Sequence, residues 1–202
     1  YIVEDDYDSE FKYTGRPIPA LKANDINDKV IYLGSFSKSI SPAIRVSYLV
    51  LPKALLNIYQ RELPYFICPV PTLNQKILYR FIKDGYFVKH INKMRTLYKK
   101  KREFLVNTIK AYSSKILNKE IQIQGADAGL HMVIKLNQKI NEKLFLNECL
   151  ENSLKLYSLE EYNIEEIHRE NSYFLLGYAN LTNKEIEEGI LLLLKILKKY
   201  YM

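Results

Sequence analysis

The chain has 202 residues, of which 48% are apolar and 12% aromatic, and this composition is sufficient for one domain of ordinary size or two small ones. Its two cysteines, Cys68 and Cys149, lie far apart without zinc-site or disulfide-scaffold spacing, so we expect buried, reduced thiols and no metal. The longest apolar run, 190–194, is too short to span a bilayer and no leader opens the chain, which indicates a cytoplasmic protein without a membrane partner.

The first half of the chain has the pattern of an α/β sheet. Short β-branched runs at 1–4, 30–33 and 46–51 predict strands, and each run ends where polar residues cluster. Ligands of open α/β sheets gather beyond the carboxyl ends of the strands. Helices are expected from Pro52 and, after a break at 64–71, from Thr72 as N-cap to about residue 84.

A basic segment follows Gly85. Between residues 89 and 115 there are nine Lys or Arg and a single acid, Glu103, which accounts for much of the net charge of +7. A basic stripe can bind nucleic acid. Here we favour the solvated face of a long amphipathic helix, because apolar residues recur at helical spacing: Phe87, Ile91, Met94, Tyr98, Leu105, Ile109 and Tyr112.

The last third of the chain predicts a small α+β lobe. Strands are expected at 121–124, 130–136, 154–157 and 173–178, with helices at 141–150 and from a Thr182–Glu185 capping box to about residue 199. The charged stretch 159–172 predicts a surface loop. The domains are therefore expected to be a partial α/β domain at 1–84, a linking helix at 85–113 and a small α+β domain at 114–202.

Lys38 is the most informative residue. It lies in Gly34-Ser35-Phe36-Ser37-Lys38-Ser39, directly after a predicted strand, and Arg45 follows seven residues later. A lysine placed in this way can hold a carbonyl cofactor as a Schiff base while hydroxyl groups and an arginine bind its phosphate, and pyridoxal phosphate has both groups. The alternatives are an ordinary turn for the serine-rich segment and a surface ion pair for Arg45.

The run Glu4-Asp5-Asp6-Tyr7 follows the first predicted strand. A pyridinium ring needs an anion beside its nitrogen, which is the role we predict for Asp5, and Tyr7 could hydrogen-bond the phenolic oxygen of the ring. A cation site or a solvated turn are the alternatives. The separation of Asp5 and Lys38 along the chain leaves room for a turn, a connection and a return strand, so the two residues can face each other across a cofactor.

Several blocks together resemble fold-type I aminotransferases, and more narrowly the MocR/GabR regulators of the GntR family. These blocks lie at residues 1–11, 31–39, 42–48, 90–102 and 125–131 in the order typical of the family, so the resemblance spans essentially the whole chain. The implied fold is the C-terminal half of the large domain of a pyridoxal phosphate-dependent transferase plus its small C-terminal domain. The implied function is effector sensing by an aminotransferase-like domain in a transcriptional regulator.

The resemblance also implies roles for individual residues. Lys38 would be the catalytic Schiff-base lysine, Asp5 and Tyr7 would contact the cofactor ring, and Asn180 stands where the family is expected to have an arginine for the effector or substrate carboxylate. The residues that would serve the phosphate are Ser35, Ser37 and Arg45.

The resemblance further implies a homodimer, an amino-acid-like effector, and DNA binding only through a winged-helix domain missing from this chain. The alternatives are a genuine class I/II aminotransferase that uses pyridoxal 5'-phosphate and a cofactor-free remnant or dimerisation module. Arg169 lies near Asn180 in the sequence and could compensate for the missing arginine.

Overall fold

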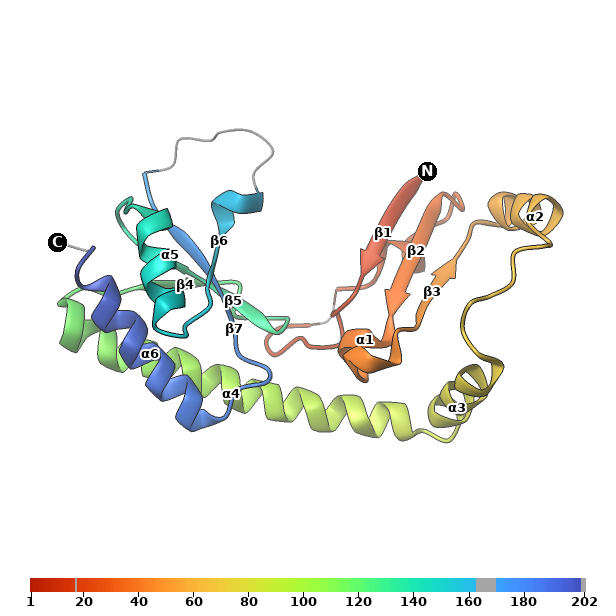
Figure 1. The fold of residues 1–202 in the computed structure, drawn as a ribbon. Helices are drawn as coiled ribbons and strands as arrows, with labels where there is room; N and C mark the ends of the chain where they lie inside the picture. Colours follow the sequence, from red (N-terminus) through yellow and green to blue (C-terminus); the bar gives the residue numbers. More distant parts are fainter. Residues whose placement is uncertain (17, 163–169, 201–202) are drawn as a thin grey trace. The chain divides into compact units, whose positions relative to one another are not determined.

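The computed structural model describes residues 1–16, 18–162 and 170–200 (Figure 1). The chain divides into two compact units, here called unit 1 (Tyr1–Arg95) and unit 2 (Thr96–Met202). The long helix α4, Tyr86–Leu117, begins in unit 1 and continues into unit 2. Within the described ranges, no helix combines the length and the apolar character needed to cross a membrane.

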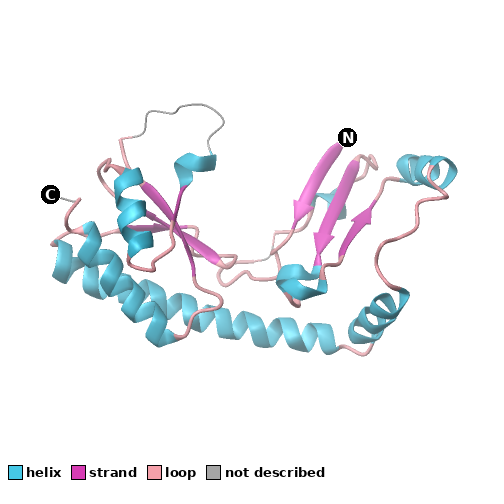
Figure 2. Cartoon of the chain, viewed as in Figure 1, coloured by secondary structure: helices cyan, strands magenta, loops and turns pink. Residues whose placement is uncertain are grey.

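Unit 1 contains a three-stranded sheet in the order β1-β2-β3, formed by Ile2–Asp6, Val30–Ser35 and Ser47–Val50 (Figure 2). β1 and β2 are parallel, with Asp6 opposite Gly34, whereas β3 returns antiparallel to β2. The carboxyl ends of β1 and β2 therefore lie at the same edge of the sheet. The other elements of unit 1 are η1 (Leu21–Asn24), α1 (Phe36–Ser39), η2 (Pro42–Ile44), α2 (Lys53–Glu62) and α3 (Thr72–Lys83).

Two expectations for unit 1 were wrong. Pro71, not Thr72, takes the N-cap position of α3, and no side chain caps that helix end. Cys68 is exposed, because it lies in a segment between α2 and α3 whose apolar side chains are themselves exposed. Cys149 of unit 2 is buried as predicted, and desolvation raises the pKa of its thiol to about 12.

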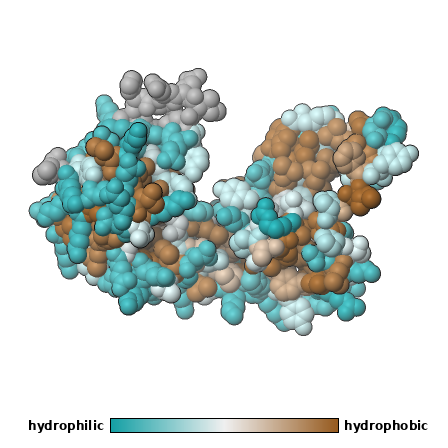
Figure 3. Space-filling model, in the orientation of Figure 1, coloured by the Kyte–Doolittle hydropathy of each residue, from teal (hydrophilic) through white to brown (hydrophobic). Residues whose placement is uncertain are grey.

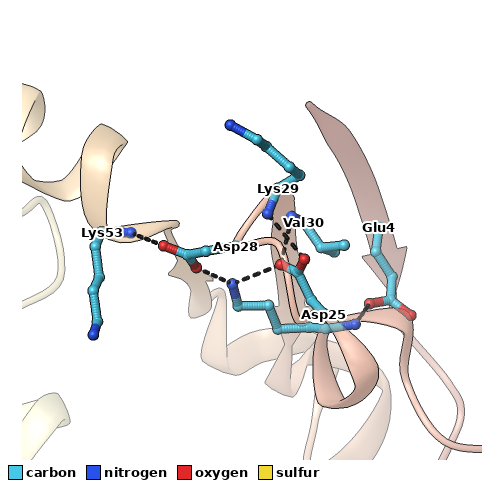
Figure 4. A network of polar contacts seen from close by, with 7 residues as sticks. Glu4, Asp25, Asp28, Lys29, Val30 and Lys53 are labelled. Carbon is cyan, nitrogen blue, oxygen red and sulfur yellow. Dashed lines mark hydrogen bonds and ion pairs between the residues drawn. The ribbon is translucent and has the colours of Figure 1, made fainter.

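A network of carboxylates fastens the loop before β2 to its neighbours (Figure 4). Asp25 accepts hydrogen bonds from the backbone N–H groups of Lys29 and Val30 at 2.9 and 2.7 Å, and Asp28 accepts one from the N–H of Lys53. The Lys22 amine bridges the two carboxylates, at 3.2 Å from Asp25 and 3.0 Å from Asp28. Through these hydrogen bonds, the loop that carries Asp25 and Asp28 fixes both the start of β2 and the start of α2.

Unit 2 is a four-stranded sheet in the order β4-β5-β7-β6, and all its pairs are antiparallel. Burial alternates along β5 and β7, where Met132, Ile134, Phe174 and Leu176 are buried while their neighbours are not, so one face of the sheet carries the core. The strands are Gln122–Gln124, His131–Lys135, Tyr157–Ser158 and Tyr173–Gly177.

Helices α5 (Glu142–Glu151) and α6 (Asn183–Leu197) complete the core of unit 2 together with α4. The predicted capping box is confirmed, with the Glu185 N–H donating to Thr182 Oγ1 and the Thr182 N–H donating to Glu185. The predicted strand at 154–157 was largely wrong, because β6 has only two residues and is followed by η3 (Leu159–Tyr162). Ser172, at the end of the predicted surface loop, is fully buried instead, and its hydroxyl accepts a hydrogen bond from the Ile140 N–H at 3.2 Å.

The amphipathic interpretation of α4 is confirmed. Ile91, Leu105 and Ile109 are buried, and none of the apolar residues predicted for the inner face is exposed. In unit 1, the Arg95 guanidinium on α4 donates from Nε to the Glu10 carbonyl at 2.9 Å. Part of the basic segment is therefore engaged in holding the fold.

The Figure 4 network predicts a loss of stability in acid. Hydrogen bonds from backbone N–H groups, with help from Lys22, hold the pKa values of Asp25 and Asp28 below their usual range. Their stabilisation is complete above the unfolded pKa of about 3.9 and disappears as the pH falls through the lower folded values. We expect the double variant Asp25→Asn/Asp28→Asn to unfold at lower urea concentration than wild type at pH 7, and the difference to vanish in acid.

Asparagine tolerates the left-handed backbone of Asp28, φ 50°, so the substitution removes charge without imposing strain. The control is Glu120→Gln, which changes an exposed acid of unit 2 and should leave the urea midpoint unchanged at every pH. A stability gap between wild type and the double variant that persists unchanged at low pH would contradict the assignment.

Candidate functional site in unit 1

The predicted site residues of unit 1 gather at one edge of its sheet. Asp5 lies near the carboxyl end of β1, opposite Leu33 of β2, and Ser35 is the last residue of β2. Lys38 lies in the short helix α1, directly after β2. The parallel pairing thus brings an acidic cluster and the Lys38 motif to the same edge, as the sequence predicted for strand ends.

A closed loop presents Lys38 and Arg45. Ser35 pairs with Ser47 in the register of β2 and β3, and the Phe36 N–H donates to the Val46 carbonyl at 3.0 Å, so both ends of the loop 36–45 are tied together. Arg45 has a left-handed backbone, φ 48° and ψ 41°. Non-glycine residues rarely adopt this conformation, and such outliers are frequent at functional sites.

The serines of the loop form its internal framework. Ser35 is the N-cap of α1, and its Oγ accepts the N–H of Ser37 at 3.1 Å. Ser39 is buried, and its hydroxyl donates to the Ser35 carbonyl at 3.4 Å. The Ser37 hydroxyl has no partner among the described residues and is thus available to a ligand.

Tyr7 is electrostatically linked to the acidic cluster. The negative charge of Asp8 is the main cause that raises the pKa of the Tyr7 phenol, followed by burial and by the charge of Asp5. A raised pKa keeps the hydroxyl protonated at neutral pH. Tyr7 can therefore act as a hydrogen-bond donor beside Asp5.

An aromatic cluster next to the site was not predicted from the sequence. The ring of Tyr48 lies against Gly34, where an added Cβ would come within 2.2 Å of the tyrosine Cζ. Phe36 and Tyr32 flank the same ring, with centroids 5.2 and 6.1 Å away. A glycine inside a strand is the signal that could have indicated this close approach.

Asp6 is held in place beside the site. Its carboxylate accepts hydrogen bonds from the Tyr32 hydroxyl at 2.7 Å and from the Ser9 hydroxyl at 2.8 Å. Burial, followed by the hydrogen bond to Asp6, raises the pKa of Tyr32, so this phenol also stays protonated. Asp6 therefore has a structural role, because its carboxylate is already hydrogen-bonded. Asp5, in contrast, is exposed and has no hydrogen bond within the described part of the chain.

Asn180 belongs to unit 2. It is exposed in the turn that follows β7, beyond the strand itself, and the Lys101 amine donates to the preceding carbonyl of Ala179 at 2.7 Å. Its proposed role in binding a carboxylate stays a prediction. Arg169 lies outside the described residues.

The side chains at the sheet edge fit a phosphate-bearing carbonyl cofactor. Over the described ranges, neither the Lys38 amine nor the Arg45 guanidinium makes a hydrogen bond or ion pair within the protein. The edge therefore offers an amine for a carbonyl, a guanidinium and a hydroxyl for a phosphate, and a carboxylate for a ring nitrogen.

Comparison with known proteins identifies the family. The family model for aminotransferase class I and II matches residues 7–191. The chain belongs to the class I and II aminotransferase family. Among its relatives, the uncharacterized HTH-type transcriptional regulators YdeL and YhdI of Bacillus subtilis are 35% and 36% identical over 94% of this chain. The probable rhizopine catabolism regulatory protein MocR of Rhizobium meliloti is 30% identical over 94%.

The chain spans 40%, 39% and 37% of the length of these three relatives.

Solved aminotransferases have the same fold. The α-aminoadipate aminotransferase LysN of Thermus thermophilus, complexed with N-(5'-phosphopyridoxyl)-L-leucine, gives a TM-score of 0.78 at 25% identity, over 98% of this chain and 50% of LysN. An archaeal alanine:glyoxylate aminotransferase gives 0.80 at 24% identity, over 98% of this chain and 48% of its own. The predicted fold-type I class is confirmed.

The contact between Gly34 and Tyr48 gives a prediction about the site. We expect Gly34→Ala to displace the Tyr48 ring and to destabilise unit 1 by about 1–3 kcal/mol, the usual cost of overpacking. Tyr48→Ala should relieve the clash, so the double variant should be less destabilised than the sum of the single ones, measured by urea unfolding.

Tyr48→Phe is the matched control. It keeps the ring carbons that lie within 3 Å of the added Cβ, so Gly34→Ala should remain destabilising in that background. Additive effects of Gly34→Ala and Tyr48→Ala would show that the ring does not restrict position 34.

Proposed function

We propose that this chain is the C-terminal part of an aminotransferase-like domain that binds pyridoxal 5'-phosphate and senses an amino-acid-like effector in a MocR/GabR-type transcriptional regulator. The observation that carries the proposal is the closed loop 36–45, which presents Lys38 and Arg45 at the sheet edge where Asp5 also lies. The identity of 35% to an HTH-type regulator over 94% of the chain supports a regulatory output.

Each residue would have a defined task at this edge. Lys38 would attach the cofactor through its amine, Asp5 would hold a proton on the pyridine nitrogen, and Tyr7 would donate a hydrogen bond to the ring oxygen. When bound, the cofactor supplies an electron sink for amino compounds. The groups for its phosphate would be the side chains of Ser35, Ser37 and Arg45, of which the arginine contributes a permanent charge.

A genuine aminotransferase is the second candidate. The match of the class I and II model to residues 7–191 favours it, as does the fold of LysN. In that case Lys38 would also carry the proton that the α-carbon of the substrate loses to the carbonyl carbon of the cofactor. The 26% identity to an aromatic-amino-acid aminotransferase of Thermococcus litoralis is lower than the identity to the regulators, which is why we place the sensor first.

We further propose that the complete protein is a cytoplasmic homodimer that contacts DNA through a winged-helix domain outside this chain. Unit 1 supports the dimer, because β3, α2 and α3 expose a large set of apolar side chains, and such surfaces mark interfaces. The most exposed of them include Leu49, Ile58, Leu73, Ile77 and Tyr79. Figure 3 shows a further apolar patch over β1 and β2. Sedimentation of the complete protein as a monomer would contradict this assignment.

Lys38 gives the central test. We expect the complete protein to gain a visible absorption band with pyridoxal 5'-phosphate, and borohydride to remove that band and fix the cofactor on the peptide containing Lys38, as detected by mass spectrometry. Lys38→Ala should abolish both results. Lys29→Ala removes another exposed amine of unit 1 and should leave both unchanged.

A band and a fixed cofactor that survive Lys38→Ala would refute the cofactor assignment. A measurement of keto-acid release from amino acids distinguishes the aminotransferase from the regulator. Turnover at ordinary enzymatic rates of about 1–10³ s⁻¹, lost in Lys38→Ala, would favour the aminotransferase over the sensor.

A further inference from the structure

An aromatic contact joins the loop that carries Lys38 to the first turn of α4. The ring of Phe36, two residues before Lys38, lies 6.0 Å from the ring of Phe87, and the two ring planes are 86° apart. Aromatic pairs favour this edge-to-face arrangement, with centroids about 4.5–7 Å apart. Both residues belong to unit 1, and Phe87 is the second residue of α4. None of the tasks proposed for the sheet edge falls to Phe87.

Phe36 anchors the loop through its backbone and its ring. Its N–H donates to the Val46 carbonyl at 3.0 Å, and its own carbonyl accepts hydrogen bonds from the N–H groups of Ile40 and Ser41 at 2.9 and 3.3 Å. Its ring also contacts Tyr48, with 5.2 Å between the centroids. Phe36 therefore connects α1 to the residue before β3, to a ring of β3 and to α4.

Phe87 is held by a pair of helices. Its ring lies 6.4 Å from that of Phe81 on α3, and Phe81 in turn contacts His90, one turn further along α4, at 6.2 Å. Gly85 has φ 76°, which lets the chain pass directly from α3 into α4. In contrast, α1 has only four residues, and a helix of this length is not stable by itself. The position of α1 therefore depends on its tertiary contacts.

Building on the proposed function, we propose that Phe87 is a positioning residue for Lys38. By holding the Phe36 ring, Phe87 sets where α1 presents the amine to the carbonyl of the cofactor. The amine nitrogen adds to the carbonyl carbon, and the two amine hydrogens leave with the carbonyl oxygen as water. Such a bond forms only when the two atoms are within reach, and a displacement of about 1 Å can slow a reaction about 100-fold.

The other groups of the site are fixed by the sheet. Asp5 lies in the ladder of β1 with β2, and Arg45 lies two residues before Ser47, which pairs with Ser35. Backbone hydrogen bonds, not the Phe87 ring, set the positions of this carboxylate and this guanidinium. Loss of the ring should therefore affect the bond to the amine more than the binding of the cofactor ring and phosphate.

Two ligands separate these contributions. Pyridoxine 5'-phosphate has a hydroxymethyl group in place of the carbonyl of pyridoxal 5'-phosphate, so it cannot bond to the amine. In the complete protein, followed by equilibrium dialysis, Phe87→Leu should weaken pyridoxal 5'-phosphate about fivefold, the factor that corresponds to an aromatic pair of about 1 kcal/mol. Pyridoxine 5'-phosphate should be unchanged. Phe87→Tyr keeps the ring and should bind both ligands as wild type does.

Tyr86→Leu is the matched control. It removes the neighbouring ring of α4, which is exposed and stacks on Phe81, and it should leave the affinity for both ligands unchanged. Phe36→Leu removes the proposed contact from the other side and should act as Phe87→Leu does. The double variant should be no weaker than either single one, because both changes remove the same interaction.

Hydrogen exchange tests the anchor without any cofactor. The amides of Ile40 and Ser41 report the closure of α1, because both donate to the Phe36 carbonyl. They should exchange faster in Phe87→Leu than in wild type. The amides in the ladder of β1 with β2 should exchange at the wild-type rate, which also shows that the variant is folded.

The wild-type protein provides a test that needs no substitution. With phenylalanine labelled for NMR, the ring signals of Phe87 should shift with pyridoxal 5'-phosphate and not with pyridoxine 5'-phosphate. The absence of this difference would overturn the positioning role, as would equal weakening of both ligands by Phe87→Leu. A wild-type protein that forms no bond at Lys38 would refute the proposed function itself. A wild-type bond that Phe87→Leu and Phe36→Leu leave intact would refute the positioning role alone.

Discussion

The parallel pairing of β1 with β2 is the constraint on which the candidate site depends. It sets Asp6 opposite Gly34 and so places the acidic cluster at the same edge as Ser35 and Lys38. These groups are far apart in the sequence, and within the described ranges no hydrogen bond joins the acidic side chains to those of Ser35 and Lys38. The backbone ladder brings them to one edge, and the hydrogen bond from Tyr32 on β2 to Asp6 on β1 adds to it. The Figure 4 network fixes the start of β2.

Two positions of unit 1 have an unusual backbone or packing geometry close to the exposed Lys38 side chain. Arg45 adopts a left-handed backbone, and Gly34 is the residue that lets the Tyr48 ring approach β2. Both features fall within or next to the loop that presents Lys38. Strain and close packing at such a place are typical of sites that must hold a ligand in a fixed orientation, which is how we interpret them here.

In unit 2, helices cover the apolar face of an antiparallel sheet. The core continues from Ile134 and Phe174 on the strands to Leu105 on α4 and Leu194 on α6. A cavity of about 330 Å³ beside Gly189, with a mostly apolar wall, interrupts this packing.

By itself, the sequence determined most of the longer helices and strands, the family and the Lys38 motif, because hydrophobic periodicity, the Thr182–Glu185 box and the strand-end polar residues are local signals. Only the tertiary structure decided that Ser172 is buried, that Cys68 is exposed and that Asp6 is held by Tyr32 while Asp5 stays exposed. Burial and long-range hydrogen bonds depend on which segments pack together, and no local pattern encodes them. The cavity beside Gly189 is of the same kind, since a single glycine in a helix does not reveal which neighbour leaves its space unfilled.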